Sequence, residues 1–407
     1  MNKLVLLFSL FASFNLFSID RIVQQNGPVG TFASVGAAVT AAVDGDQIII
    51  NNRTDLLPWV ENISINKSLT FLCATDNTPF WVEGNYTITM ADNRSVTFNG
   101  MRNTNGSIFQ TGTIPVFRTN VTIVQSEIVG NLNFGIGVNL LLSNTRSRMV
   151  YYTYGKIYGN DLQNLILTSD ATSEDVNQIV GNRIGYLYAA SGSSVSISNN
   201  TQYLFFSNNF CYNATANDAM SVLSLKTGAV GNRIVNCTFW QNSSNQNPSF
   251  SASAVGLRLA ASTGTLTVEN CSMGGFYNSS STGSNGLIQT AGVANTTFTY
   301  NMYHNMFTGG TAPSSTLANF SSSAATYNVN ADGSSSSAVT VNAGNPLNDY
   351  LDLDLSRNDI GCFGGSYSRE NFWPMVNTQS SRVIFVTTPR VVNQGGTVNM
   401  TGTGIDE

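Results

Sequence analysis

One short phrase recurs along the chain, and it constrains the fold more than any other feature. The phrase is a polar residue followed by apolar residues at alternate positions, as in KSLTFLCAT from Lys67 and NRSVTFNGM from Asn93. Alternation with a period of two is typical of a β-strand that buries one face. Aligned on their first apolar residues, the phrases begin at Leu69, Val96, Val121, Leu140, Leu165, Val195, Val222, Leu257 and Leu287.

The phrases are spaced as the units of a repeat protein. Successive starts are separated by 27, 25, 19, 25, 30, 27, 35 and 30 residues, which is the spacing of a repeat architecture. A second phrase, IVGN or a relative, interleaves with the first, at Ile128, Ile157, Ile179 and Ala229. Asn and Gly tolerate the left-handed backbone angles that a sharp corner between strands needs. Each repeat is therefore expected to hold at least two short strands joined at Gly/Asn corners.

Among repeat folds, this pattern favours an all-β parallel β-helix. Leucine-rich repeats need a fixed leucine grid and a helical half, which the chain lacks, and propeller blades need about four strands in about forty residues. Two or three short strands per coil, turned by Asn and Gly, predict about ten to twelve stacked coils. Asn209, Asn236 and Asn270 are expected to stack as a hydrogen-bonded ladder inside the coils, beside Cys211, Cys237 and Cys271.

The N-terminal region predicts export and a cap. Lys3 followed by the apolar stretch 4–17 has the length of a signal peptide, so residues 1–18 are expected to be removed. Val35, Val39 and Val43 have helical spacing within residues 32–43, and Asp-Gly-Asp follows at 44–46. Because the open end of a parallel sheet invites aggregation, we expect residues 32–43 to form a capping helix.

Composition excludes some partners. Charged residues make up 10% of the chain, the net charge is −5, and no cluster of Lys or Arg occurs. Nucleic acid is therefore not an expected partner, and no apolar run beyond the signal peptide is long enough for membrane insertion. A polar but weakly charged surface suits an exported protein of the cell surface, periplasm or extracellular space. The five cysteines are an odd number and form no C-x-x-C pair, so we expect buried free thiols rather than a zinc site.

The opening of the chain resembles that of a known superfamily. TFASVGAAVTAAVDGDQIII and VENISINKSLTFLCA look like the start of pectate-lyase-like proteins. LDLDLSRNDIGCFGG (351–365) is similar to the closing segment of secreted β-helix proteins from Bacteroidetes-type bacteria, although Leu355 stands where such segments often carry Gly. The resemblance implies a single-stranded right-handed parallel β-helix over 19–365. The composition of 309–337, rich in Ser, Thr, Ala and Gly, predicts a loose coil or a long surface loop. A C-terminal tail or hairpin follows at 366–407, where 383–386 and 397–400 are strand-like.

The superfamily includes lyases and hydrolases, whose chemistry needs catalytic acids and bases. The N-T-D, D-D and G-H-G signatures of polygalacturonases do not occur, and the sole histidine, His304, has no carboxylate partner in sequence. The acids repeat at no common phase. The densest catalytic candidate is Asp218 with Lys226 and Arg233. The alternative is a corner Asp beside two solvated bases.

The best metal candidate lies in the closing segment. Oxygen-bearing side chains follow at nearly alternate positions, at the density that calcium loops use: Asp352, Asp354, Ser356, Asn358 and Asp359. The expected role of such an ion is structural, and no other cofactor is implied. The alternative is a turn held by Asx hydrogen bonds and by pairing of Arg357 with the acids.

Aromatic residues gather in the central coils. The group also includes Tyr203, Phe205 and Tyr212, and about half of its rings are expected to fill the core. Rings on a flat β-face can stack on sugars, and the candidates are Tyr151, Tyr152, Tyr154, Tyr186 and Tyr188.

Two functions fit these features. The first is a non-enzymatic, structural, adhesive or glycan-binding protein, with a polysaccharide or an envelope protein as partner. The second is a diverged polysaccharide lyase or glycoside hydrolase acting on an acidic glycan. The first is favoured because enzyme signatures are missing, and the sequence does not define the oligomeric state.

Overall fold

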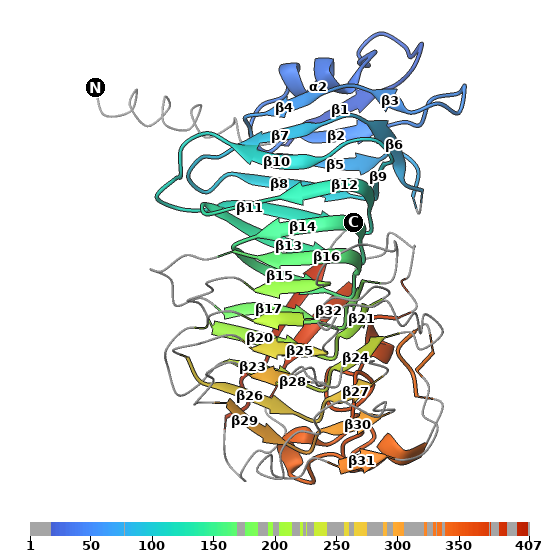
Figure 1. The fold of residues 1–407 in the computed structure, drawn as a ribbon. Helices are drawn as coiled ribbons and strands as arrows, with labels where there is room; N and C mark the ends of the chain where they lie inside the picture. Colours follow the sequence, from blue (N-terminus) through green and yellow to red (C-terminus); the bar gives the residue numbers. More distant parts are fainter. Residues whose placement is uncertain are drawn as a thin grey trace, which may run out of the picture.

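The repeated strands assemble into two large parallel sheets. The computed structural model describes residues 18–76, 78–168, 176–185, 194–197, 203–213, 220–222, 225, 232–241, 256–259, 264–274, 288–290, 296–304, 321–323, 329–330, 332–335, 338–373, 375, 382–388 and 397–405. Strands from the two sheets alternate along the chain and stack one above another (Figure 1). The twelve strands of the first sheet, sheet A, are β1 (Asp20–Val23), β2 (Gln47–Ile50), β5 (Leu69–Cys73), β8 (Ser95–Asn99), β11 (Thr119–Val124), β13 (Val138–Ser143), β15 (Tyr154–Tyr158), β17 (Val176–Val180), β20 (Tyr203–Ser207), β23 (Arg233–Val235), β26 (Leu266–Glu269) and β29 (Thr296–Thr299).

The second sheet, sheet B, contains two rows of strand pairing. Row 1 follows sheet A directly along the chain and consists of β3 (Trp59–Val60), β6 (Phe80–Glu83), β9 (Met101–Asn103), β12 (Glu127–Asn133), β14 (Arg146–Tyr152), β16 (Asp161–Leu167), β18 (Arg183–Ile184), β21 (Phe210–Asn213), β24 (Thr238–Gln241), β27 (Ser272–Gly274), β30 (Met302–His304) and β31 (Ser321–Ser323). Row 2 consists of β4 (Ile63–Ile65), β7 (Tyr86–Thr89), β10 (Ile108–Thr111), the second halves of β12, β14 and β16, then β19 (Val195–Ile197), β22 (Met220–Val222), β25 (Leu257–Leu259) and β28 (Ile288–Thr290). This all-β arrangement of parallel strands agrees with a parallel β-helix.

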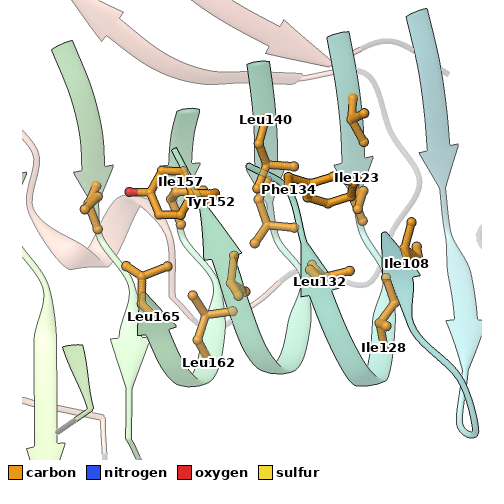
Figure 2. Close-up of a cluster of buried hydrophobic side chains, with 14 of the residues drawn as sticks. Ile108, Ile123, Ile128, Leu132, Phe134, Leu140, Tyr152, Ile157, Leu162 and Leu165 are labelled. Atoms are coloured by element: carbon orange, nitrogen blue, oxygen red, sulfur yellow. The ribbon is translucent and has the colours of Figure 1, made fainter. Parts of the chain in front are cut away.

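The core lies between the sheets, because alternate side chains of every strand turn inward. Strand β5 shows this alternation: Leu69, Phe71 and Cys73 are buried, whereas Thr70 and Leu72 between them are half-buried. Figure 2 shows the inward side chains of sheet A, such as Ile123 and Leu140, meeting those of sheet B, such as Leu132 and Leu165. The buried column runs from the N-terminal helix to Phe298.

The aligned phrases belong to two sheets, which corrects the single alignment that the sequence predicted. Val121 and Leu140 are partners in sheet A, but Leu140 pairs with Gly155 in the next strand. Leu165 instead lies in row 2 of sheet B, where it pairs with Val195. Gly155 contributes no apolar side chain, so the sequence alignment missed β15. The next aligned phrase, at Leu165, belongs to sheet B.

A two-residue corner joins sheet A to row 1 in nearly every repeat. Its first residue has a positive φ between 49° and 73°: Gly100, Gln125, Asn144, Gly159, Gly181, Asn208, Asn236, Asn270 and Tyr300. Gly and Asn predominate because they tolerate this conformation best. The second corner residue is buried in each case after Gly100: Ser126, Thr145, Asn160, Asn182, Asn209, Cys237, Cys271 and Asn301.

The buried corner residues form the expected ladder, but in a different register. The Asn182 amide donates to Asn209 Oδ1 at 2.9 Å and accepts from the Asn160 amide at 2.9 Å, so three consecutive repeats are linked. Asn209 was predicted correctly. Asn236 and Asn270 are not in this ladder, because they occupy the first corner position and turn to the outside.

A short helix, α2 (Val35–Ala41), covers the first strands. The Ser34 hydroxyl accepts from the Ala37 N–H, and the Glu61 carboxylate accepts from the N–H groups of Val35 and Gly36 at 2.8 Å each. These bonds satisfy donors that a helix N-terminus leaves free. The helix packs on β1, β2 and β4 and ends before Val43, which is exposed.

The C-terminal part returns along the outside of the stack (Figure 1, orange to red). It contains the 3₁₀ helices η2 (Ala338–Thr340), η3 (Asn348–Tyr350) and η4 (Arg369–Asn371), and then the antiparallel pair β32 (Arg382–Thr387) and β33 (Thr401–Ile405). The second of these strands begins beyond the 397–400 stretch that the sequence indicated. Residues 1–17 of the expected signal peptide, and most of the expected loop at 309–337, lie outside the described residues. In the part of the chain that is described, no helix is long and apolar enough to cross a membrane.

Candidate functional site

The candidate site is a groove between the outer face of sheet A and the C-terminal part of the chain. Its volume is about 780 Å³, within the range of small-ligand sites. Phe205 of β20 and Arg233 of β23 form its floor. They are paired neighbours in adjacent strands, and their side chains lie on the outer face of sheet A. We refer to this cavity as the sheet A groove.

Aromatic side chains from distant parts of the chain line the sheet A groove. The Phe205 and Tyr367 rings meet edge to face, with centroids 5.7 Å apart and planes at 81°. Tyr367 also stacks on Phe385 of β32 at a centroid distance of 4.9 Å, and Phe385 stacks on Tyr158 of β15 at 4.8 Å. Pairs of this kind hold rings in defined positions. Tyr350 and Phe372 also line the groove.

One wall of the groove carries a hydrogen-bonded polar cluster. Arg233 Nη2 donates to the Tyr350 hydroxyl at 3.1 Å and lies 4.0 Å from Glu269 Oε2. Glu269 is buried, and its other oxygen accepts from Asn345 Nδ2 at 2.6 Å. Burial, together with a hydrogen bond to Glu269, raises the pKa of Tyr350 to about 12. Tyr350 is therefore a neutral hydroxyl at physiological pH.

The outward-facing corner residues hold the C-terminal segment that closes the groove. Asn208 Nδ2 donates to the carbonyls of Cys362 and Gly364, at 3.2 and 2.5 Å. Asn236 Nδ2 donates to Asn358 Oδ1 and to the Asp359 carbonyl, each at 2.8 Å. These two corner residues follow neighbouring strands of sheet A, so their side-chain amides bind successive parts of the C-terminal segment.

Arg233 is the one member of the predicted catalytic set that the structure describes. It lies in the sheet A groove, beside Glu269 and Tyr350. Asp218 and Lys226 lie outside the described residues. Glu269 was visible in the sequence only as a member of a strand phrase, whereas Phe205 belongs to the group of aromatic residues in the central coils. Tyr350 and Tyr367 carried no signal, since tertiary contacts alone bring the C-terminal segment to sheet A.

The predicted sugar-stacking tyrosines occupy three different environments. Tyr152 is fully buried, and Figure 2 shows its ring in the core beside Ile157. The stacking prediction for Tyr152 is wrong, because strand alternation turns it inward next to outward-facing Tyr151, which is half-buried. Tyr154 is 3% exposed, and the Arg118 guanidinium lies 3.4 Å from its ring centroid. Tyr186 and Tyr188 lie outside the described residues.

Tyr154 lines a second, smaller cavity. This cavity has a volume of about 490 Å³, and it lies on the outer face of sheet A near β33. Arg118 and Lys156 supply its charged side chains among the described residues. Arg118 donates to Asn139 Oδ1 at 3.1 Å.

The predicted calcium ligands are used for hydrogen bonds within the protein. Asp352 accepts from the N–H groups of Asp359 and Gly365. Asp354 accepts from the Ser356 N–H at 2.9 Å. The Asn358 amide is buried against Asn236.

The same segment agrees in part with the alternative interpretation, a turn held by hydrogen bonds. No group of three or more His, Cys, Asp or Glu that could hold a metal ion occurs among the described residues. Arg357 donates to the carbonyls of Gly344 and Ala343 rather than to the acids. The alternative interpretation predicted Asx turns and pairing of Arg357 with the acids. The Asx turn of Asp354 is present, whereas the Arg357 bonds described here go to backbone carbonyls. Burial raises the pKa values of Asp352 and Asp359.

A charged ladder on the outer face of row 1 was missed by sequence reasoning. Its members alternate in sign along successive strands: Arg102, Glu127, Arg146, Asp161 and Arg183. The Arg183–Asp161 pair is the tightest, with bonds of 2.8 and 2.5 Å, whereas the Arg102–Glu127 pair spans 3.7 Å and is more exposed. Glu127 and Asp161 thus share one register position two strands apart, which corrects the expectation that the acids repeat at no common phase.

The comparisons with known proteins identify no relative. The chain matches no family model, no curated protein and no solved structure.

Proposed function

We propose that this chain is an exported, non-enzymatic protein that binds a glycan in the sheet A groove and acts in adhesion or in the structure of the cell surface. The single observation that carries the proposal is the groove itself, where aromatic rings stand beside amide and hydroxyl groups in a cavity of about 780 Å³. Sugars combine apolar ring faces with polar edges, so such a lining suits them. The partner is a polysaccharide at an extracellular, surface or periplasmic location.

A rigid rod is the scaffold that this function requires. We infer that the two sheets form a single-stranded right-handed β-helix of the pectate-lyase-like kind, with α2 as its N-terminal cap and about ten to twelve coils. The two rows of sheet B, the two-residue corners and the asparagine ladder support this inference. Binding sites held on such a scaffold keep their geometry without a ligand.

The state of the groove's ionisable groups favours binding over catalysis. Arg233 and Glu269 neutralise one another, and the remaining Glu269 oxygen accepts from Asn345. A general base at neutral pH needs a pKa near the working pH, whereas that of Tyr350 is raised to about 12. The convergence of these three side chains nevertheless supports a diverged polysaccharide lyase or hydrolase as a second candidate. Release of unsaturated uronate from acidic polysaccharides would identify the lyase.

Retention on immobilised polysaccharides tests glycan binding. The purified protein should be retained by at least one polysaccharide, and Phe205→Ala and Tyr367→Ala should each weaken retention severalfold, because an aromatic contact contributes about 0.5–1.5 kcal/mol. Phe117→Ala is the matched control, since Phe117 is 60% exposed and lies outside the groove. Retention that all three variants leave unchanged would refute the assignment of the site.

A further inference from the structure

The charge of the sheet A groove defines what class of glycan it can hold. Two charged residues line it among the described side chains, Arg233 and Asp349. Asp349 is exposed at the rim, at the start of the turn that carries Tyr350. The groove therefore presents one cation and one anion directly, with the buried Glu269 carboxylate immediately behind the cation.

Arg233 already has a hydrogen-bond partner and a carboxylate neighbour within the protein. Arg233 donates to the Tyr350 hydroxyl at 3.1 Å, and its guanidinium carbon lies 5.7 Å from the centroid of the Tyr350 ring. Glu269 is 4.0 Å away and supplies the opposite charge. Arg233 is 40% exposed, whereas Glu269 is 4% exposed. A ligand carboxylate would compete with Glu269 for Arg233, and drawing Arg233 away would leave the buried Glu269 charge uncompensated, which is costly. Arg233 is thus a poor receptor for an acidic sugar.

The described charged residues at the groove have a negative sum. Counting Arg233, Glu269 and Asp349, the site has a formal charge of −1, and the whole chain has a net charge of −5. The other polar side chains at the groove, including Ser366, Asn371 and Thr388, are uncharged. A neutral sugar can hydrogen-bond to such groups without an electrostatic cost, whereas a uronate would approach Asp349 with like charge.

From this arrangement we infer that the sheet A groove selects an uncharged glycan and rejects its acidic counterpart. The inference rests on the proposed function and specifies the ligand class of the same site. Glu269 acts as the specificity-determining residue, because it pairs with Arg233, the cation that could bind a carboxylate among the described residues lining the groove. Asp349 adds repulsion at the rim.

Matched pairs of glycans test this inference. Neutral polysaccharides are presented on a panel beside the same polymers oxidised at C6 to uronates, and affinities are measured at low and high salt. The neutral member of at least one pair should bind about fivefold more tightly, which corresponds to about 1 kcal/mol. Affinity for the neutral member should not change with salt, whereas the difference within a pair should shrink as the charges are screened.

Two conservative variants assign the effect to the groove. Glu269→Gln keeps the size of the side chain and releases Arg233, so affinity for the oxidised member should rise severalfold and become salt-sensitive. Asp349→Asn should narrow the difference in affinity between the neutral and the oxidised member of a pair. Asp20→Asn is a control with the same loss of charge, since Asp20 is exposed in β1 and is not part of the groove. Thermal unfolding of each variant verifies that the fold is kept.

The possible failures are distinguishable. If the wild-type protein prefers oxidised members, and salt weakens that binding, then glycan binding holds and the selectivity inferred here is wrong. If Glu269→Gln prefers the neutral over the oxidised member as strongly as the wild type does, Glu269 does not determine the specificity. If no member of any pair binds, the proposed function fails and the inference fails with it.

Discussion

The asparagine ladder allows a quantitative prediction, because Asn182 is fully buried at its centre. Its side chain takes part in five hydrogen bonds: it donates to Ile157 O, Val180 O and Asn209 Oδ1, and it accepts from the backbone and side-chain nitrogens of Asn160. Asn182→Ala deletes all five.

The expected loss of stability follows from the partners left behind. Each hydrogen bond has a net contribution of about 1 kcal/mol, and a buried group left without a partner costs about 1–3 kcal/mol. The Asn160 N–H and the Ile157 carbonyl both lose a partner in the buried corner. We therefore expect Asn182→Ala to lower the free energy of unfolding by about 3–5 kcal/mol.

Equilibrium urea unfolding provides the measurement, with the midpoint compared at an unchanged m-value. Asn139→Ala is the control, because Asn139 also bonds along the stack, to Asn120 at 3.2 Å and Arg118 at 3.1 Å, but on the exposed face. Its loss should cost less than about 1 kcal/mol. If the two variants lose the same stability, the buried ladder does not support the stack as argued here.

Four further outcomes follow from individual groups. Tyr152→Phe should raise stability by about 1 kcal/mol in urea unfolding, since the buried Tyr152 hydroxyl has no hydrogen-bond partner among the residues that the structure describes; destabilisation would show that the hydroxyl is used. Burial raises the pKa of Asp359, so the folded state takes up its proton more readily than the unfolded state does, and its contribution to stability is lost as pH rises through the raised pKa. Asp359→Asn should therefore stabilise the protein most near neutral pH and little near pH 3, which midpoints measured across this range would verify. All five cysteines are buried and free, so a maleimide should label them only after denaturation; fast labelling of the native protein would contradict their burial. Gly181→Ala should loosen the C-terminal segment, because an added methyl group would collide with Phe372; limited proteolysis between 338 and 373 should become faster, and no change would show that the segment adapts.

The period-two phrases predicted parallel strands around a shared core, and that much depends on local pattern. Alternation reports which side chains turn inward, since adjacent residues of a strand face opposite sides. It does not report which sheet a strand joins. The alignment missed β15 because Gly155 stands where an apolar residue was expected. The corner has two residues, so its buried position is occupied by Cys237 and not by Asn236, which was predicted to lie in the ladder.

The candidate site was only partly visible in the sequence for a related reason. Arg233 could be proposed because it lies in a repeat, but Tyr350 is 117 residues away and belongs to no repeat. The tyrosine chosen for sugar stacking at position 152 faces the core, because aromatic composition does not distinguish the two faces of a strand.

What the sequence determined by itself is the architecture of stacked parallel strands, because a repeated alternation of apolar residues has to bury one face in every repeat. Tertiary structure alone decided where a site could form. The C-terminal segment is brought to sheet A by the outward amides of Asn208 and Asn236, together with the packing of Phe385 on Tyr158. These contacts join residues more than 100 positions apart, and no local pattern records them.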